Sequence, residues 1–160
     1  MNIQDIYDQA IIDPSLLSSI DINKLLEDID SETTEYLEGK TLEIIYNTIK
    51  SVIINSCFFQ NNDSIIEKLI GYRYIERVCE LRLGVYCRWI NKTSKKLEAG
   101  GIIISTKICD EGIQVICKTA FGRHVSFRFN ESIVFQKLTV EEQLILLAYE
   151  HIQSYDNESI

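Results

Sequence analysis

The spacing of hydrophobic residues divides the chain into a helical first half and a β-rich second half. Up to Leu83 the apolar positions recur every three or four residues, and from Gly84 onward they alternate with polar ones. This change of period predicts an α+β fold. Its expected parts are a helical region over residues 1–82, a small β-unit over 83–138, a C-terminal helix over 139–155 that packs on the core, and a loose tail over 156–160.

The longest helix is predicted over residues 40–59, where Ile45, Ile49 and Ile53 recur on one apolar face. A second helix is predicted over residues 72–83, and it would place Arg73 and Arg77 four positions apart on an exposed face. Shorter helices are predicted over residues 13–17, 21–29, 31–39 and 64–70. Thr139 and Glu142 form a capping-box sequence ahead of the last apolar run, so a helix should begin there.

Five short strands follow Gly84, and glycine-containing turns separate several of them. They are predicted over residues 85–89, 102–108, 113–118, 125–130 and 131–138. Trp89 and Phe127 fall on strand faces that a core would require. Five strands in about 55 residues predict a small antiparallel β-barrel of the SH3-like type, or a curled five-stranded sheet.

Composition sets limits on the class of protein. The 160 residues are 46% hydrophobic, which is enough for one domain with a core. No run reaches the roughly 18 apolar residues of a membrane span, and the first residues lack a basic start, so we expect neither membrane insertion nor secretion. The five cysteines have no zinc-knuckle spacing and no disulfide framework, which favours a reducing, cytosol-like compartment.

Charge is unevenly distributed along the chain. Residues 1–70 hold 13 acids and 4 bases, residues 71–137 hold 6 acids and 12 bases, and residues 138–160 hold 5 acids and no base. Two interpretations remain open: the basic middle segment neutralises the protein's own acidic helices, or it contacts phosphate or an acidic partner.

No known catalytic motif is present, and the chain has only two histidines. Cys117 and His124 could approach across neighbouring strands as a cysteine–histidine nucleophile pair. A buried strand cysteine and an exposed histidine without a catalytic role account for the same two residues. Asp110 and Glu111 precede Gly112 and are better explained as a turn than as a catalytic pair. We therefore expect a protein that is not an enzyme and that has no cofactor and no metal site.

Basic and aromatic residues are interleaved in the second half of the chain. This arrangement suits a basic groove in which exposed aromatic rings stack on bases, with Tyr86 and Phe121 as the exposed rings. The candidate binding residues are Arg73, Arg77, Tyr86, Arg88, Lys92, Lys95, Lys96, Lys118, Phe121 and Arg123.

Residues 83–149 also carry a recognisable pattern. Arg88-Trp89, the double glycine Gly100-Gly101, Cys117-Lys118, the pair Phe127 and Phe129, and the "FQKLTVEE" segment ending at Glu142 occur in order. This pattern resembles small uncharacterised proteins of nucleocytoplasmic large DNA viruses, the giant viruses of amoebae and algae. The resemblance implies a viral source, expression in the host cytoplasm or viral factory, and a place in the virion, but no activity.

These observations together predict a non-enzymatic viral accessory or structural protein. It would act as a protein–protein interaction module whose partners are other viral proteins. The alternative is a nucleic-acid-binding or transcription-associated factor that uses the basic β-region. The sequence does not predict the oligomeric state.

Overall fold

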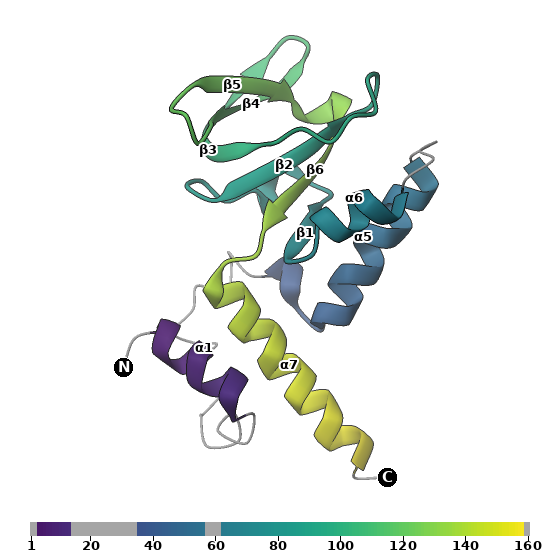
Figure 1. Ribbon diagram of the computed structural model, residues 1–160, viewed down its shortest axis with the longest axis vertical. Coiled ribbons are helices and arrows are strands. Elements are labelled where there is room, and N and C mark those ends of the chain that lie inside the picture. Colours follow the sequence, from purple (N-terminus) through teal and green to yellow (C-terminus); the bar gives the residue numbers. More distant parts are fainter. Residues whose placement is uncertain (1–2, 14–34, 57–61, 159–160) are drawn as a thin grey trace. The chain divides into compact units, whose positions relative to one another are not determined.

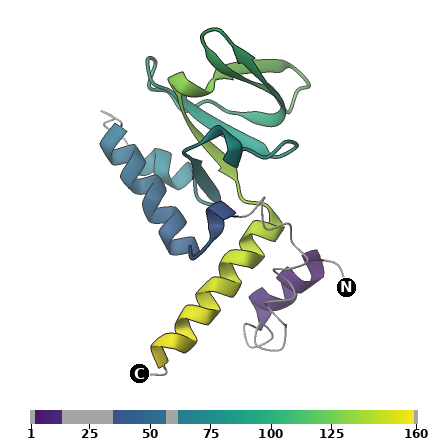
Figure 2. The ribbon, with the colours of Figure 1, turned by 180° about the vertical axis from the view of Figure 1, so that it is seen from behind.

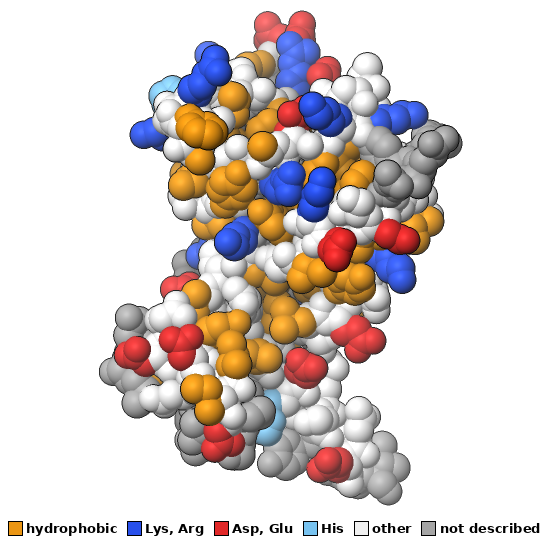
Figure 3. All heavy atoms as spheres, viewed as in Figure 1, with side chains coloured by type: hydrophobic (Ala, Val, Ile, Leu, Met, Phe, Trp, Pro, Cys, Tyr) orange, Lys and Arg blue, Asp and Glu red, His pale blue; other side chains and the backbone are white. Residues whose placement is uncertain are grey.

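The computed structural model describes residues 3–13, 35–56 and 62–158. The chain forms two compact units, Met1–Ile44 with Leu138–Ile160, and Ile45–Lys137. The units differ sharply in charge. The first holds 16 acids and 2 bases (net -14), and the second holds 8 acids and 14 bases (net +6). On the face shown in Figure 3, the visible Lys and Arg side chains lie over the unit that contains the strands.

Six antiparallel strands form one sheet in the second unit, in the order β1-β6-β2-β3-β4-β5. The five predicted strands are confirmed, but a sixth strand was not foreseen and the sheet does not close into a barrel (Figure 1). The prediction of a five-stranded barrel is therefore wrong, and the curled sheet is the better description. The strands are β1 (Tyr72–Ile75), β2 (Tyr86–Asn91), β3 (Gly101–Cys109), β4 (Gly112–Lys118), β5 (His124–Arg128) and β6 (Ser132–Lys137).

The sixth strand, β1, replaces the first part of the helix predicted over residues 72–83. Gly71 takes a left-handed conformation (φ 85°) and ends the preceding helical turn. The chain then pairs with β6, with Tyr72 opposite Lys137 and Ile75 opposite Val134. Burial alternates along β1, with Arg73 and Ile75 buried. The helix prediction failed because it treated Arg73 as a surface residue. Arg73 and Ile75 are both buried, so the burial in this segment has the two-residue period of a strand.

Two helices and two short 3-10 turns complete the described part of this unit. The helices α5 (Leu42–Ser56) and α6 (Asn62–Lys68) confirm the two helices predicted in that part of the chain, and Ile45, Ile49 and Ile53 of α5 are buried as predicted. Figures 1 and 2 show α5 and α6 side by side next to β1. The 3-10 turns in the strand region are η2 (Val78–Glu80) and η3 (Phe129–Glu131), and a third, η1 (Glu35–Leu37), precedes α5.

Strand β6 is buried on both faces and separates two hydrophobic cores. Ile133 and Phe135 pack with Ile49 and Ile53 of α5 on one face. Val134, on the other face, belongs to the core inside the curl of the sheet, a cluster with Trp89, Phe127, Cys87, Cys117, Ile103 and Val115 among its members. The curled half of the sheet therefore has an apolar interior of its own, as the alternation of Trp89 and Phe127 predicted.

A buried polar network anchors β6 at its C-terminal end. The Gln136 side chain is fully buried; its Oε1 accepts bonds from Arg73 Nη2 (3.1 Å) and the Arg82 backbone N–H (2.9 Å), and its Nε2 donates to the Arg82 carbonyl (2.7 Å). Arg73 Nη2 also donates to the Glu80 carbonyl (2.7 Å). Nothing in the sequence pattern pointed to this network, because buried polar residues look like surface positions.

The first unit contains α1 (Ile3–Ile12), η1 and α7 (Val140–Glu158). The predicted capping box at the start of α7 is confirmed: the Thr139 N–H donates to Glu142 Oε1 (3.0 Å), and the Glu142 N–H donates to Thr139 Oγ1 (3.1 Å). Tyr7 of α1 donates to Gln143 of α7 (2.7 Å), above a small core of Ala10 and Leu144. The helices predicted over residues 13–17 and 21–29 lie essentially outside the described residues.

Candidate functional site

Strand β5 is an edge strand whose outer side carries free backbone groups. Residue pairs of the β4–β5 ladder run from Gln114 opposite Arg128 to Lys118 opposite His124. The Thr119 N–H donates to the Arg123 carbonyl (2.8 Å), which marks that pair as hydrogen-bonded. Since hydrogen-bonded and non-hydrogen-bonded pairs alternate, His124, Ser126 and Arg128 direct their N–H and C=O groups away from β4. Within the described part of the chain, no backbone–backbone bond outside the helices and ladders uses His124 or Ser126. Arg128 is the N-cap of the 3-10 turn η3, so its carbonyl accepts the first bond of that turn and only its N–H remains on the outer side.

A pocket of about 750 Å³ lies along this edge. Its lining includes side chains from both faces of β5: Ser126 and Arg128 from one face and Phe127 from the other. A pocket that touches both faces of a strand must lie at the free edge of that strand. We call this pocket and the outer edge of β5 the β5 groove. Its remaining lining residues are Gln114, Trp89, Asn91, Thr93, Ser94, Glu98 and Glu131.

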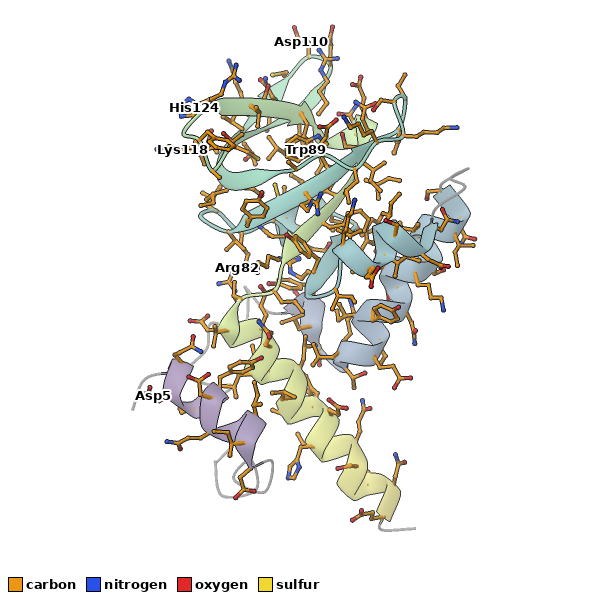
Figure 4. All side chains as sticks on the ribbon, viewed as in Figure 1. Asp5, Arg82, Trp89, Asp110, Lys118 and His124 are labelled. Atoms are coloured by element: carbon orange, nitrogen blue, oxygen red, sulfur yellow. The ribbon has the colours of Figure 1, made fainter. Side chains whose placement is uncertain are left out.

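The floor of the β5 groove is aromatic. The rings of Trp89 and Phe127 stack with centroids 4.2 Å apart and an interplanar angle of 19°. Each of these residues is only 7% exposed, so the pair is packed as part of the inner core and presents only a small surface to the groove. Figure 4 shows Trp89 beneath β5, on the inner side of the curl. The floor is therefore rigid and apolar.

The opposite wall is the connection from β2 to β3. Asn91 Oδ1 accepts bonds from the N–H groups of Thr93 (2.8 Å) and Ser94 (3.2 Å), and the Lys95 N–H donates to the Asn91 carbonyl (2.7 Å). Lys95 has a positive φ of 56°, which closes this turn. The Glu98 N–H then donates to the Trp89 carbonyl (2.9 Å). These bonds hold the wall in one conformation without a ligand.

Charged residues concentrate at the Arg128 end of the groove. The Arg128 guanidinium forms ion pairs with Glu111 and with Glu131, the latter at 3.4 Å. Glu98 lines the same end, and its side chain has no ion-pair partner among the described residues. The groove lining itself thus contains two carboxylates and one guanidinium.

The ten candidate residues from the sequence do not form one surface. Arg73 is buried in the Gln136 network, and Arg77 pairs with Glu80 (3.7 Å) beside η2. The Tyr86 hydroxyl donates to the Ala99 carbonyl (2.6 Å), and Arg88 Nε donates to the Glu98 carbonyl (3.0 Å). Arg73, Tyr86 and Arg88 are engaged in bonds within the fold, and Arg77 lies beside η2, so the expectation that these four side chains form a shared binding face with the rest gains no support.

The other six candidates fall into two groups. Lys92 and Lys96 are exposed on the β2–β3 connection, where Lys95 is half-buried, and Lys92 Nζ donates to the Asn130 carbonyl (3.3 Å). Lys118, Phe121 and Arg123 gather at the end of the β4–β5 hairpin. Phe121 is 93% exposed, in agreement with its predicted role as an exposed ring, whereas Tyr86 is only half-exposed.

Sequence reasoning missed the residues that line the groove. It singled out the lysines of the β2–β3 connection, whereas the uncharged Asn91, Thr93 and Ser94 of that segment face the pocket. Ser126, Glu98 and Glu131 were not among the candidate binding residues. The alternation of Phe127 with Ser126 and Arg128 gave the two faces of β5, but no local signal tells an edge strand from a central one.

Cys117 and His124 do not form a nucleophile pair. Cys117 is buried and lies opposite Val125, whereas His124 is exposed and lies opposite Lys118. The Cys117 thiol instead lies 3.5 Å from the Cys87 thiol. The hydrogen bond between the two thiols, together with burial, raises the pKa of Cys87 well above its usual value, so this thiol stays protonated at neutral pH.

We expect iodoacetamide to label Cys79 in the native protein within minutes and to spare Cys87 and Cys117. Cys79 is exposed, and the other two are fully buried. Peptide mass mapping before and after denaturation in guanidinium measures the labelling at each site. Rapid native labelling of Cys87 or Cys117 would contradict the packing of the inner core.

No protein-family model, curated protein or solved structure matches this chain. In the part of the chain that the structure describes, no helix has the length and apolar character needed to cross a membrane.

Proposed function

We propose that the protein is a protein–protein interaction module that binds an extended peptide segment as an additional strand on β5. The observation that carries this proposal is the position of the β5 groove: a pocket lined by Ser126 and Arg128, whose backbone N–H groups point away from β4. In strand addition, main-chain hydrogen bonds supply affinity and alternating side-chain contacts supply specificity. The β5 groove offers both.

The geometry of the groove suits a strand more than a compact ligand. An added strand sends alternate side chains to the two sides of the sheet, and the pocket has lining residues on both sides of β5. On the inner side its residues would meet the Trp89–Phe127 floor, and on the outer side they would meet Ser126 and Arg128. Because the β2–β3 connection is already fixed by Asn91, little ordering free energy is lost on binding.

Nucleic-acid binding has weaker support than peptide binding. It would need the basic residues to line one groove with exposed aromatic rings. Arg73 is buried, Arg88 is bonded to the chain's own backbone, and the β5 groove carries two carboxylates, Glu98 and Glu131. Of the ten candidate residues, Phe121 with Lys118 and Arg123 comes nearest to the arrangement that the nucleic-acid alternative requires.

The class of partner follows from the sequence resemblance alone. If the chain comes from a large DNA virus, the segment that occupies the groove belongs to another viral protein, and the host cytoplasm, the viral factory or the virion is where they meet. The strand-addition proposal does not depend on this source.

We expect Ser126→Pro to weaken peptide binding at least tenfold and Ser126→Ala to leave it within about twofold. Proline removes an N–H that points away from β4, so the sheet keeps its ladder bonds while an added strand loses one of its own. Alanine keeps the N–H and removes only the hydroxyl, whose bond from Gln114 Nε2 (2.9 Å) is exposed. Fluorescence anisotropy with peptides selected from a random seven-residue display library measures the effect.

Thermal unfolding of both variants is the control for the fold of the second unit. A folded Ser126→Pro variant that binds the selected peptides as tightly as the unchanged protein would rule out strand addition at β5.

A further inference from the structure

The two ends of the β5 groove carry opposite charge. At the His124 end, Lys118 lies directly across the ladder from His124, and Arg123 is the adjacent turn residue. All three side chains are exposed, and the described residues place no carboxylate in an ion pair with Lys118 or Arg123. Figure 4 shows Lys118 and His124 together at this end of the hairpin. This end has two permanent positive charges.

The lining of the groove at the Arg128 end is acidic on balance, with Glu98 and Glu131 against Arg128. Four carboxylates belong to this end: Glu98 and Glu131 in the groove lining, and Asp110 with Glu111 at the β3–β4 turn. The turn is held there because Asn130 Nδ2 donates to the Glu111 carbonyl (3.3 Å). The cations around this end are Arg128, Lys107 in the same cross-strand row, Lys92 at the Asn130 carbonyl, and Lys95 and Lys96 on the β2–β3 connection outside the pocket lining.

On the basis of the proposed strand addition at β5, we propose that the occupant of the β5 groove is a peptide segment that runs antiparallel to β5. Its five residues follow the pattern basic–apolar–any–apolar–acidic. The basic residue lies opposite Arg128, beside Glu98 and Glu131, and the acidic residue lies opposite His124, beside Lys118 and Arg123. The two apolar residues face the inner side, opposite Phe127 and Val125. All pairs of neighbouring strands in this sheet are antiparallel, and that arrangement is the more stable one per residue.

The spacing of the pattern follows from the ladder. His124 and Arg128 are four residues apart on one strand, so the partner residues opposite them are also four apart and share a face. In an antiparallel strand the residue opposite Arg128 comes first, which places the base before the acid. Opposite charges on neighbouring side chains of adjacent strands stabilise the pairing, and like charges destabilise it. The charge of Arg128 is already offset by its ion pairs with Glu111 and Glu131, so Glu98, which has no ion-pair partner among the described residues, is the group that favours a base at that position.

Two capped peptides of identical composition test the assignment. One has the core Lys-Val-Thr-Val-Glu and the other has Glu-Val-Thr-Val-Lys, each flanked by single threonines, so that net charge and hydrophobicity are equal and only charge placement differs. We expect the Lys-first peptide to bind the full-length protein about fivefold to tenfold more tightly at ~50 mM salt. The ratio should fall toward one at ~1 M salt, because exposed charges are then screened.

A charge-reversal variant and a matched control locate the effect. The Lys118→Glu/Arg123→Glu variant should lose the preference for the Lys-first peptide. The Lys50→Glu/Lys68→Glu variant makes the same change of charge on exposed positions of α5 and α6 and should keep that preference.

The outcomes separate this inference from the proposed function. Equal affinities for the two peptides, both lost in Ser126→Pro, would overturn the charge pattern and leave strand addition intact. Preference for the Glu-first peptide would overturn the antiparallel direction. Failure of both peptides to bind at ~1 mM would overturn the charge pattern. If, in addition, the Ser126→Pro variant still bound the library peptides, strand addition would be overturned as well.

Discussion

Gly100→Ala is expected to lower the free energy of unfolding of the strand unit by about 4 kcal/mol or more, which is at the high end for a single substitution. Gly100 has a φ of 88°, a conformation that costs an alanine about 1–2 kcal/mol. A Cβ at this position would also overlap the Cys87 carbonyl oxygen and lie 3.0 Å from Arg88 Cγ. The Cys87 backbone belongs to the sheet and cannot move aside without breaking the pairing of β2.

Gly84→Ala is the matched control for this prediction. Gly84 has a similar φ of 80°, but a Cβ there meets nothing within 4 Å, so only the conformational cost of about 1–2 kcal/mol remains. Urea denaturation of both variants, followed by the fluorescence of Trp89, compares the two free energies. Equal destabilisation by the two substitutions would show that the close approach of β2 to Gly100 is absent in solution.

Gln136→Leu is expected to destabilise the same unit by about 3–5 kcal/mol, because leucine leaves buried polar groups without partners. The groups that lose a partner are Arg73 Nη2, which keeps its bond to the Glu80 carbonyl, and the backbone N–H and C=O of Arg82. Leucine is similar in size to glutamine, so the decrease in the free energy of unfolding reports the lost hydrogen bonds more than a change in packing.

Gln114→Leu provides the comparison, since Gln114 is half-exposed and bonds to the exposed Ser126 hydroxyl. Water replaces that bond, so its loss is expected to cost less than about 1 kcal/mol. Urea denaturation again gives both values. A Gln136→Leu protein whose stability falls by less than about 1 kcal/mol would show that the network around Arg73 contributes little.

Local signals predicted much of the fold. The alternation of Val125 and Phe127 with polar residues identified β5, and the capping box at Thr139 located the start of α7. Both signals depend on residues that are close together in the sequence. Strand β1 was missed for the converse reason: buried Arg73 donates to Gln136, which lies 63 residues away in the sequence. No pattern within a short window contains that information.

The candidate site was predicted only in part, for a related physical reason. The exposure of Phe121 and the burial of Trp89 follow from turn position and strand alternation. The groove depends on which strand ends the sheet and on the rim that the β2–β3 connection forms opposite β5. Those are properties of topology, so the lysines of that connection attracted attention while Asn91 and Ser126 did not.

Amide hydrogen exchange at β5, resolved by residue with NMR, tests strand addition most directly. In the free protein the N–H groups of Ser126 and Arg128 should exchange quickly, because they point away from β4, while that of Phe127 should be protected by the ladder. Addition of a groove-binding peptide should slow the exchange of Ser126 and Arg128 at least tenfold. Peptide binding that leaves both amides in fast exchange would contradict the account.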